Sequence, residues 1–254
     1  MKTGNPWSSA RFRAEEYEEL LCELVARGYR SVQLKKVVRE EPHMFLRHDV
    51  DLSPELALQI ARREANIGVQ STFYFLVSTP LYSIASAPIR AILEEIIEAG
   101  HEVGLHLDVT RWDPKASDLD AFAGRECDIL ELCAGKPVET ISFHRPAPQL
   151  LGRPEPIAGR RHCYEPALFE EVGYISDSNG GWHHGHPLDH PAVQASHAIQ
   201  LLTHPIWWCN SESISASETV DELYHHRCGE LRGALEETVT AYRKSNNIVG
   251  AENS

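Results

Sequence analysis

Acidic and histidine side chains follow several apolar runs of this sequence, each at the point where the run ends. The run Met44–Arg47 leads into His48, Asp49 and Asp51. Three later apolar segments repeat the pattern, with the polar residues His106, Asp108, His144, Arg145 and His204. Carboxylates and imidazoles move protons and bind divalent metals near neutral pH. The pattern therefore favours a hydrolytic, metal-assisted enzyme.

These side chains can act together only if the fold gathers them at one place. The apolar runs that carry them are typical of strands buried in a parallel sheet. In parallel α/β folds the carboxyl ends of the strands, and the loops after them, form the active-site face. We therefore expect the polar residues to converge in space although they are far apart in the sequence.

Strand-like and helix-like segments alternate along most of the chain. Apolar residues at helical spacing, with glycine stops, predict helices over 14–28, 54–68, 87–99 and 117–133. Apolar, branched and aromatic runs predict strands over 44–51, 71–77, 101–107, 138–143, 174–176 and 199–204. Such alternation implies right-handed βαβ units. The predicted fold is α/β, a closed or nearly closed barrel of parallel strands with outer helices.

The 254 residues, 42% of them hydrophobic, are enough for one such barrel. We expect a single domain over 1–254, with its chemistry-bearing core at about 44–208 and a final helix at about 218–243. The stretch 146–166 breaks the rhythm with five prolines and three arginines, and we expect an ordered active-site loop there. Its arginines either meet an acidic substrate or are simply solvated, and they are Arg153, Arg160 and Arg161.

Composition excludes several classes of partner. The net charge of -13 opposes binding to nucleic acid and to anionic membranes. No apolar run approaches the ~20 residues of a membrane helix, and Met1–Arg13 lacks the apolar core of a secretory signal. The six cysteines form no Cys-x-x-Cys pair. We therefore expect a cytoplasmic protein with reduced thiols, no nucleic-acid partner and no membrane span.

Taken in order, the polar motifs resemble those of the NodB-type polysaccharide deacetylases, carbohydrate esterase family four, whose fold is a distorted (β/α) barrel. The resemblance lies between residues 44 and 208. It is carried by Asp49-Val50-Asp51, His101 to His106, Phe143-His144-Arg145-Pro146, Asp177 with Trp182, and Leu202-Thr203-His204. The combined motifs are also similar to the WbmS-type deacetylases of bacterial surface-sugar gene clusters.

The resemblance implies a role for each residue. Asp49 would be the general base, Asp51 and His106 would hold the metal, and His204 would be the general acid. Arg145 would orient Asp49, and Asp177 would hydrogen-bond or tune His204. One divalent transition metal is implied, with zinc expected, although mixed Asp and His sites also accept cobalt, nickel or iron.

The third metal ligand departs from the family pattern. Thr110 stands where the family places a second metal-binding histidine, four residues after His106. His144 is the preferred substitute, because it stands beside Arg145 at a strand end. Asp108 is the rival, because position i+2 on a strand points to the same side as His106. Loss of the ligand altogether is the third alternative.

The expected reaction removes an N-acyl group, which we expect to be acetyl, from an amino sugar. The sugar is expected to be nucleotide-linked, lipid-linked or a free small molecule. Two alternatives remain: a metal-free hydrolase of a cyclic amide or ureide, and an inactive sugar-binding module. Histidines 183, 184, 186 and 190 either form another metal site or border a loop. Trp182, Trp207 and Trp208 either belong to the core or form a sugar-stacking wall. His48 is expected to be structural, and the oligomeric state is left open.

Overall fold

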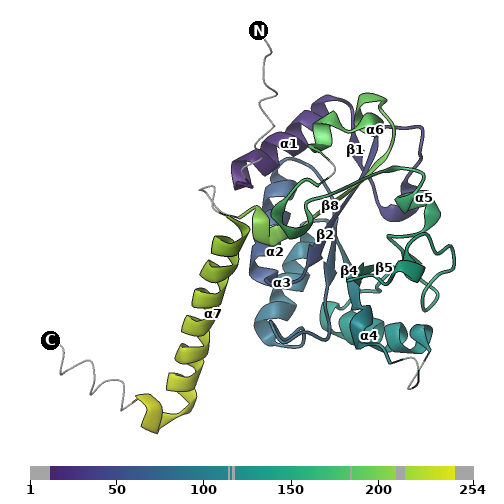
Figure 1. Cartoon of the computed structure of the whole chain (residues 1–254). Coiled ribbons are helices and arrows are strands. Elements are labelled where there is room, and N and C mark those ends of the chain that lie inside the picture. The colour runs from purple at the N-terminus through teal and green to yellow at the C-terminus, as the bar shows by residue number, and fades with distance from the viewer. Residues whose placement is uncertain (1–11, 114, 116–117, 184, 210–214, 244–254) are drawn as a thin grey trace. The chain divides into compact units, whose positions relative to one another are not determined.

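Figure 1 shows the computed structural model of the chain. It describes residues 12–113, 115, 118–183, 185–209 and 215–243. Most of the segment examined for a secretory signal, together with Ser117 and His184, lies outside the described residues. The chain divides into two compact units, 1–213 and 214–254, and each is described by itself.

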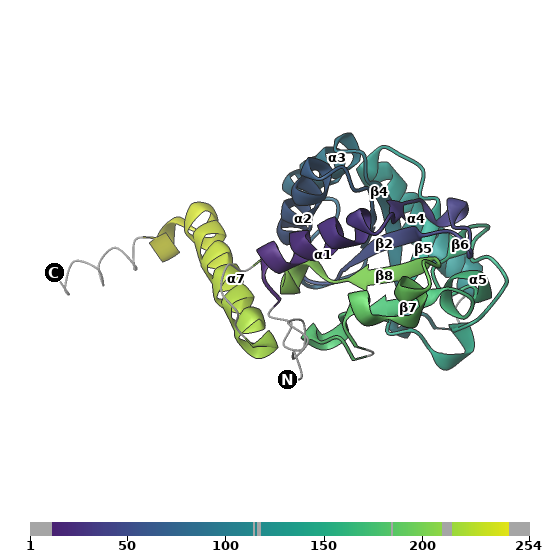
Figure 2. The same ribbon diagram turned by 90° about the horizontal axis from the view of Figure 1, so that it is seen from above.

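The first unit is built on a sheet of eight strands, and every pairing between them is parallel. The strands are β1 Arg30–Ser31, β2 His43–Val50, β3 Thr72–Phe75, β4 Glu102–Asp108, β5 Thr140–His144, β6 Arg161–His162, β7 Gly173–Ser176 and β8 Ile199–Thr203. Their order is β6-β5-β4-β3-β2-β8-β7, with β1 paired to the start of β2. Because β6 and β7 are the two ends of this order, the sheet is a curled half-barrel rather than a closed barrel (Figure 2).

Helices connect the strands and lie around the sheet (Figures 1 and 2). They are α1 Ala14–Ala26, α2 Pro54–Asn66, α3 Ala87–Glu98, α4 Leu119–Ala134, α5 Pro166–Phe169 and α6 Pro191–Gln194. Helix α2 begins as the sequence predicts, because the Ser53 hydroxyl accepts a hydrogen bond from Leu56 N at 3.3 Å and Pro54 fits the first turn. The predicted parallel α/β architecture with outer helices is confirmed.

Strand β2 is buried along its whole length, and the side chains of its two faces belong to two different sets of contacts. On one face His48 Nε2 lies 2.8 Å from the carboxylate of Glu64, and His48 Nδ1 lies 2.7 Å from the Thr203 hydroxyl. Glu64 also accepts hydrogen bonds from Tyr17 and Ser71. This buried network ties β2 to β8, α1 and α2, so His48 has the structural role expected of it. The opposite face of β2 carries Arg47 and Asp49 toward the half-barrel interior.

The second unit contains helix α7, Ala216–Thr238. It begins two residues before, and ends five residues before, the limits of 218 and 243 expected from the sequence. Ser215 and Glu218 form a capping box at its start, which satisfies backbone N–H groups that the first turn leaves free. Within the described ranges, no helix has the length and apolar character needed to cross a bilayer.

Candidate active site

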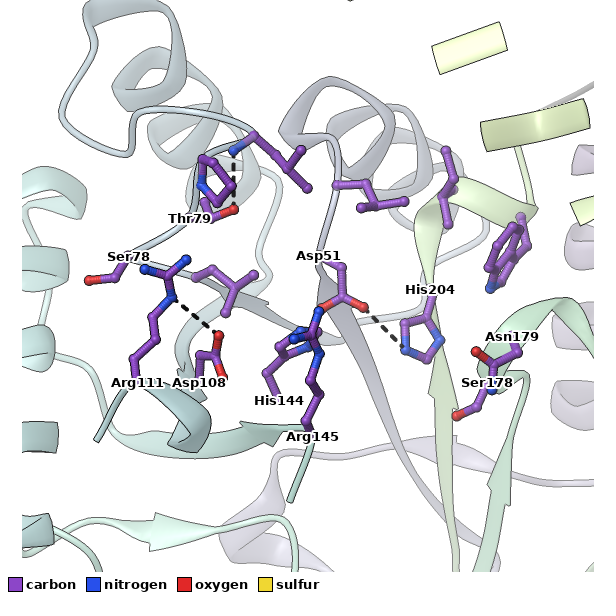
Figure 3. Close-up of a pocket in the computed structure, with 16 residues that line it drawn as sticks. Asp51, Ser78, Thr79, Asp108, Arg111, His144, Arg145, Ser178, Asn179 and His204 are labelled. Carbon is purple, nitrogen blue, oxygen red and sulfur yellow. Dashed lines mark hydrogen bonds and ion pairs between the residues drawn. The ribbon is translucent and has the colours of Figure 1, made fainter. Parts of the chain in front are cut away.

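The carboxyl ends of β2, β4 and β5 bring three potential metal ligands together. Asp51 Oδ1 lies 3.0 Å from His106 Nε2 and 3.0 Å from His144 Nδ1. One ligand atom from each side chain falls within 4.8 Å of the others. This is the set that the sequence favoured, with His144 as the third ligand. Figure 3 shows the Asp51 carboxylate next to the His144 ring.

The contacts of Asp51 fit a metal better than they fit hydrogen bonds. Its Oδ1 is buried, and neither imidazole contact has hydrogen-bond geometry. Burial raises the pKa of Asp51, but interactions with His106 and His144 outweigh it and hold the pKa well below its ordinary value. Two imidazole nitrogens and one carboxylate oxygen form a donor set that suits zinc and similar divalent ions. The residues present therefore fit a transition-metal site.

Asp108, the rival third ligand, is already engaged. Its carboxylate accepts hydrogen bonds from Thr110 N at 3.1 Å, Thr110 Oγ1 at 2.6 Å and Arg111 Nε at 3.3 Å. Thr110, which stands in place of the family's second histidine, thus caps a turn with Asp108. In the part of the chain that the structure describes, Asp51, His106 and His144 are the one group of three or more ligating side chains close enough to share an ion.

Asp49 lies beside this cluster, deeper in the half-barrel. Its side chain is 3% exposed, and its Oδ2 lies 3.9 Å from His106 Nε2. The Ser142 hydroxyl donates to both carboxylate oxygens, at 3.0 and 3.2 Å. Asp49 is therefore held in one orientation by Ser142 of β5, a strand that is not adjacent to β2 in the sheet.

The cation that contacts Asp49 is Arg47, which was not among the predicted site residues. Arg47 is fully buried, and its Nη2 lies 3.5 Å from Asp49 Oδ2 and 3.0 Å from the Tyr164 hydroxyl. The guanidinium carbon also lies 4.9 Å from the centre of the Tyr164 ring. The signal for it was present, because residues i and i+2 of a strand point to the same face.

Arg145, which the family resemblance places against Asp49, is exposed instead. It follows His144 with a φ of 51°, in the left-handed region. The structure records no hydrogen bond or ion pair between Arg145 and Asp49, both of which lie in the described ranges. Arg145 lines the pockets in front of the metal ligands.

His204 follows β8 on the other side of Asp51. Its Nδ1 lies 2.6 Å from Asp177 Oδ1, and its backbone N–H donates to the same carboxylate. Asp177 is fully buried and also accepts a hydrogen bond of 2.7 Å from Trp208 Nε1. Burial lowers the pKa of His204, but the Asp177 carboxylate outweighs it and raises the pKa to about 9. His204 Nε2 lies 3.9 Å from Asp51 Oδ2 (Figure 3).

Two adjoining pockets open onto these residues. The wider one, about 600 Å³, is lined by Asp51, His144, Arg145 and His204 together with Arg111, Trp207 and several small polar residues. The smaller one, about 270 Å³, reaches Asp49 and His106 and has a mostly apolar wall that includes Phe143, Leu151, Tyr164, Phe169, Tyr174 and Leu202. The catalytic candidates thus lie where the two pockets adjoin, between the polar groups of the wider pocket and the apolar wall of the smaller one.

Most of the remaining sequence candidates lie outside the two pockets. His183 bonds to the Ser178 carbonyl at 2.8 Å, while the Nδ1 atoms of His186 and His190 accept backbone N–H groups two residues ahead. These three histidines therefore support turns, and His184 lies outside the described residues. Trp208 is core, whereas Trp207 lines the wider pocket.

The arginines of 146–166 do not line either pocket. Each has a carboxylate partner, in the pairs Arg153–Glu155, Arg160–Glu131 and Arg161–Glu165. These ion pairs connect residues of the loop to each other and to α4. The structure therefore favours neither contact with an acidic substrate nor simple solvation for these arginines.

No family model matches the chain, and no curated protein matches it significantly. Solved structures do. A CE4 family pseudoenzyme from Bacillus anthracis aligns at 12% identity and a TM-score of 0.42, over 74% of this chain and 63% of its own. A family 4 carbohydrate esterase from the same organism aligns at 14% identity and a TM-score of 0.43, over 83% and 86%. A family 4 acetyl xylan esterase from Clostridium thermocellum, in complex with a cobalt ion, aligns at 14% and 0.38, over 74% and 84%.

The chain spans less than two thirds of the length of the pseudoenzyme structures that it matches, 63% to 65% of each. At TM-scores below 0.5, these likenesses are too weak to assign an activity to this chain.

Proposed function

We propose that this chain is a metal-dependent hydrolase that removes an N-acyl group from an amino sugar. Acetyl is the acyl group that we expect. The observation that carries the proposal is the placement of the cluster Asp51, His106 and His144 between two further titratable groups. Asp49 lies on the inner side of the cluster, and His204 with its Asp177 partner lies on the other. Amide hydrolysis needs such a pair, one group to take a proton and one to give it.

Asp51, His106 and His144 would hold the divalent ion. When bound, such an ion lowers the pKa of a coordinated water toward ~7 and polarises a carbonyl oxygen. Asp49 lies next to this position and accepts hydrogen bonds only from Ser142 and Arg47 among the described residues, so its carboxylate is suited to take a proton.

His204 is suited to give the proton to the departing amine. Asp177 binds Nδ1, which leaves Nε2 as the atom on the pocket side. A pKa of about 9 keeps the imidazole protonated at neutral pH. Asp177 itself is fixed by the Trp208 indole and by the His204 backbone, so the ring is held in one orientation.

Arg47 holds Asp49 in place in this scheme. The buried guanidinium forms an ion pair with the buried Asp49 carboxylate, and each group compensates for the charge of the other. The Nη2 that contacts Asp49 also donates to the Tyr164 hydroxyl, and the Tyr164 ring lies beside the guanidinium carbon. Arg47 contacts Asp49 but does not itself line either pocket, so it is a positioning residue.

The pockets support an amino-sugar substrate. The wider pocket offers hydroxyl and amide groups together with the Trp207 side chain, a combination that suits a sugar ring. The smaller pocket offers an apolar wall beside Asp49 for the acyl group. A nucleotide-linked or lipid-linked sugar remains within this proposal, and zinc is the metal we expect.

Amine release from N-acetylglucosamine, short chitooligosaccharides and UDP-N-acetylglucosamine tests the proposal. Asp49→Asn and His204→Ala should each lose most of the activity while keeping the circular dichroism spectrum of the wild type. Asp128→Asn, a change at an exposed acid of α4 outside both pockets, is the matched control. Full activity in either site variant would overturn the proposal. Activity that survives complete chelation would instead favour the metal-free hydrolase.

A further inference from the structure

Arg145 is placed by an unusual backbone conformation. Its φ of 51° is one that a long L side chain seldom adopts, and the turn that imposes it comes directly after the metal-ligand candidate His144. Conformations of this kind persist where the surrounding structure fixes them, often at functional sites. Here the turn sets Arg145 at the junction of the two pockets, beside Asp51, His144 and His204 (Figure 3).

The charge of Arg145 is not used within the described part of the protein. The recorded ion pairs and hydrogen bonds give its guanidinium no partner there, whereas nearby Arg160 and Arg161 each hold a carboxylate. The task that the family resemblance gives to Arg145 is performed by the buried Arg47, which contacts Asp49. Arg145 therefore does not contact Asp49 and instead lines the two pockets.

A second guanidinium lines the same pocket. Arg111 uses its Nε to hold Asp108, at 3.3 Å, and its side chain is 46% exposed. Its terminal nitrogens have no recorded hydrogen bond with the described residues, so they remain available to a ligand. Figure 3 shows Arg145 next to His144 and Arg111 next to Asp108, with Ser178 and Asn179 beyond His204.

The carboxylates that line this pocket do not cancel the two arginines. Asp108 is held by Arg111 and by two hydrogen bonds from Thr110, and Asp51 Oδ1 lies 3.0 Å from His106 and from His144, with which it would hold the metal. Of the two arginines that line this pocket, Arg145 is thus the one without an anionic partner among the described residues, in a protein whose net charge is -13. A pocket of this kind selects a ligand that brings its own negative charge.

We propose that the substrate carries an anionic group, a carboxylate or a phosphate, which Arg145 binds with help from the terminal nitrogens of Arg111. The planar guanidinium donates two parallel hydrogen bonds to such a group, which gives orientation as well as affinity. The group would lie on the sugar near the acyl amide, because Arg145 and the metal-ligand candidates line the same pocket. The inference rests on the proposed deacylation and narrows its substrate class.

Steady-state kinetics with matched sugars tests it: neutral N-acetylglucosamine, its 1-phosphate and 6-phosphate, and an N-acetylated aminouronic acid. The wild type should prefer at least one anionic sugar in kcat/KM, and the phosphate and uronate arms tell which anion is used. Arg145→Gln should reduce that preference roughly tenfold or more, chiefly through KM, because it removes the charge-assisted hydrogen bonds to the anion. Arg39→Gln, a change at an exposed arginine outside both pockets, should keep it.

Binding separates this inference from the proposed function. Calorimetry with the Asp49→Asn protein measures the same sugars without turnover, with and without the Arg145→Gln change. Tighter binding of an anionic sugar, weakened by Arg145→Gln, supports the inference even if no amine is ever released, and that second result would overturn only the proposed deacylation. Equal binding of neutral and anionic sugars, or anionic binding unchanged in Arg145→Gln, overturns the inference.

Discussion

Arg47 and Asp49 lie two residues apart on one face of β2, and their side chains meet inside the half-barrel, with Nη2 and Oδ2 3.5 Å apart. Both are buried, Arg47 at 0% and Asp49 at 3% exposure. Burying either charge alone is costly, and each is tolerated because the other is present. The proposed base is thus held by a cation of its own strand as well as by Ser142 of β5.

Removing the guanidinium should therefore destabilise the fold. We expect Arg47→Met to lower the free energy of unfolding by about 3–5 kcal/mol, because it leaves a buried carboxylate without its cation. Urea denaturation measures the change.

The double variant Arg47→Met with Asp49→Asn is the matched control. It should lose less stability than the two single variants added together, since no charge remains unpaired. Simple additivity of the two losses would contradict a direct interaction between these side chains.

Asp177 should matter to the rate through His204. We expect Asp177→Asn to lower kcat by roughly 10²–10⁴-fold with little change in KM, the range over which a positioned proton donor acts. The physical reason for this loss is the 2.6 Å contact between Asp177 Oδ1 and His204 Nδ1, which orients the imidazole and favours its protonated form.

Trp208→Phe is the control for this prediction. It removes the indole donor to the other oxygen of Asp177 but leaves the carboxylate beside His204, so its effect on kcat should be clearly smaller. Equal losses in the two variants would mean that packing around Asp177, rather than its charge, accounts for the result.

Acid stability should depend on Glu64, which is fully buried under the site. Burial raises its pKa, but the neighbouring His48 and His101 and the Ser71 hydroxyl outweigh this and leave the pKa below its ordinary value of 4.5. A carboxyl with a lowered pKa contributes stability that is present above the unfolded-state value and is lost as the pH falls through the folded-state value.

Glu64→Gln should accordingly cost about 1–3 kcal/mol at pH 7 and flatten the acid limb of the stability curve. Urea midpoints between pH 3 and 7 for both proteins measure this. A constant difference between the two curves over that range would show that Glu64 does not titrate as described.

Much of this architecture could be predicted from local sequence. The alternation of apolar runs with helical patterns predicted the parallel sheet, and polar residues at strand ends predicted the meeting of Asp51, His106 and His144. These two predictions are possible because the two-residue period of a strand and the common direction of parallel strands fix where the side chains point.

Other features depend on contacts between distant residues. Arg47 interrupts an apolar strand, and only its neighbours Asp49 and Tyr164, the latter 117 positions away, explain why a charge is buried there. Strand β6 has two residues and no period to detect. The open edge between β6 and β7 follows from the curl of the whole sheet, which no single segment encodes. The histidines of 183–190 that the structure describes support turns, a role that composition alone does not distinguish from metal binding.

The third metal ligand gives the sharpest test of the site. Elemental analysis of the purified wild type should find about one equivalent of a divalent transition metal, which a chelator removes along with the activity. His106→Ala and His144→Ala should each reduce the bound metal strongly, since either change leaves two ligands. Asp108→Asn should retain it, because that carboxylate is held by Thr110 and Arg111. Metal loss in Asp108→Asn comparable to that in His144→Ala would move the third ligand to Asp108, and unchanged metal in His144→Ala would remove His144 from the site.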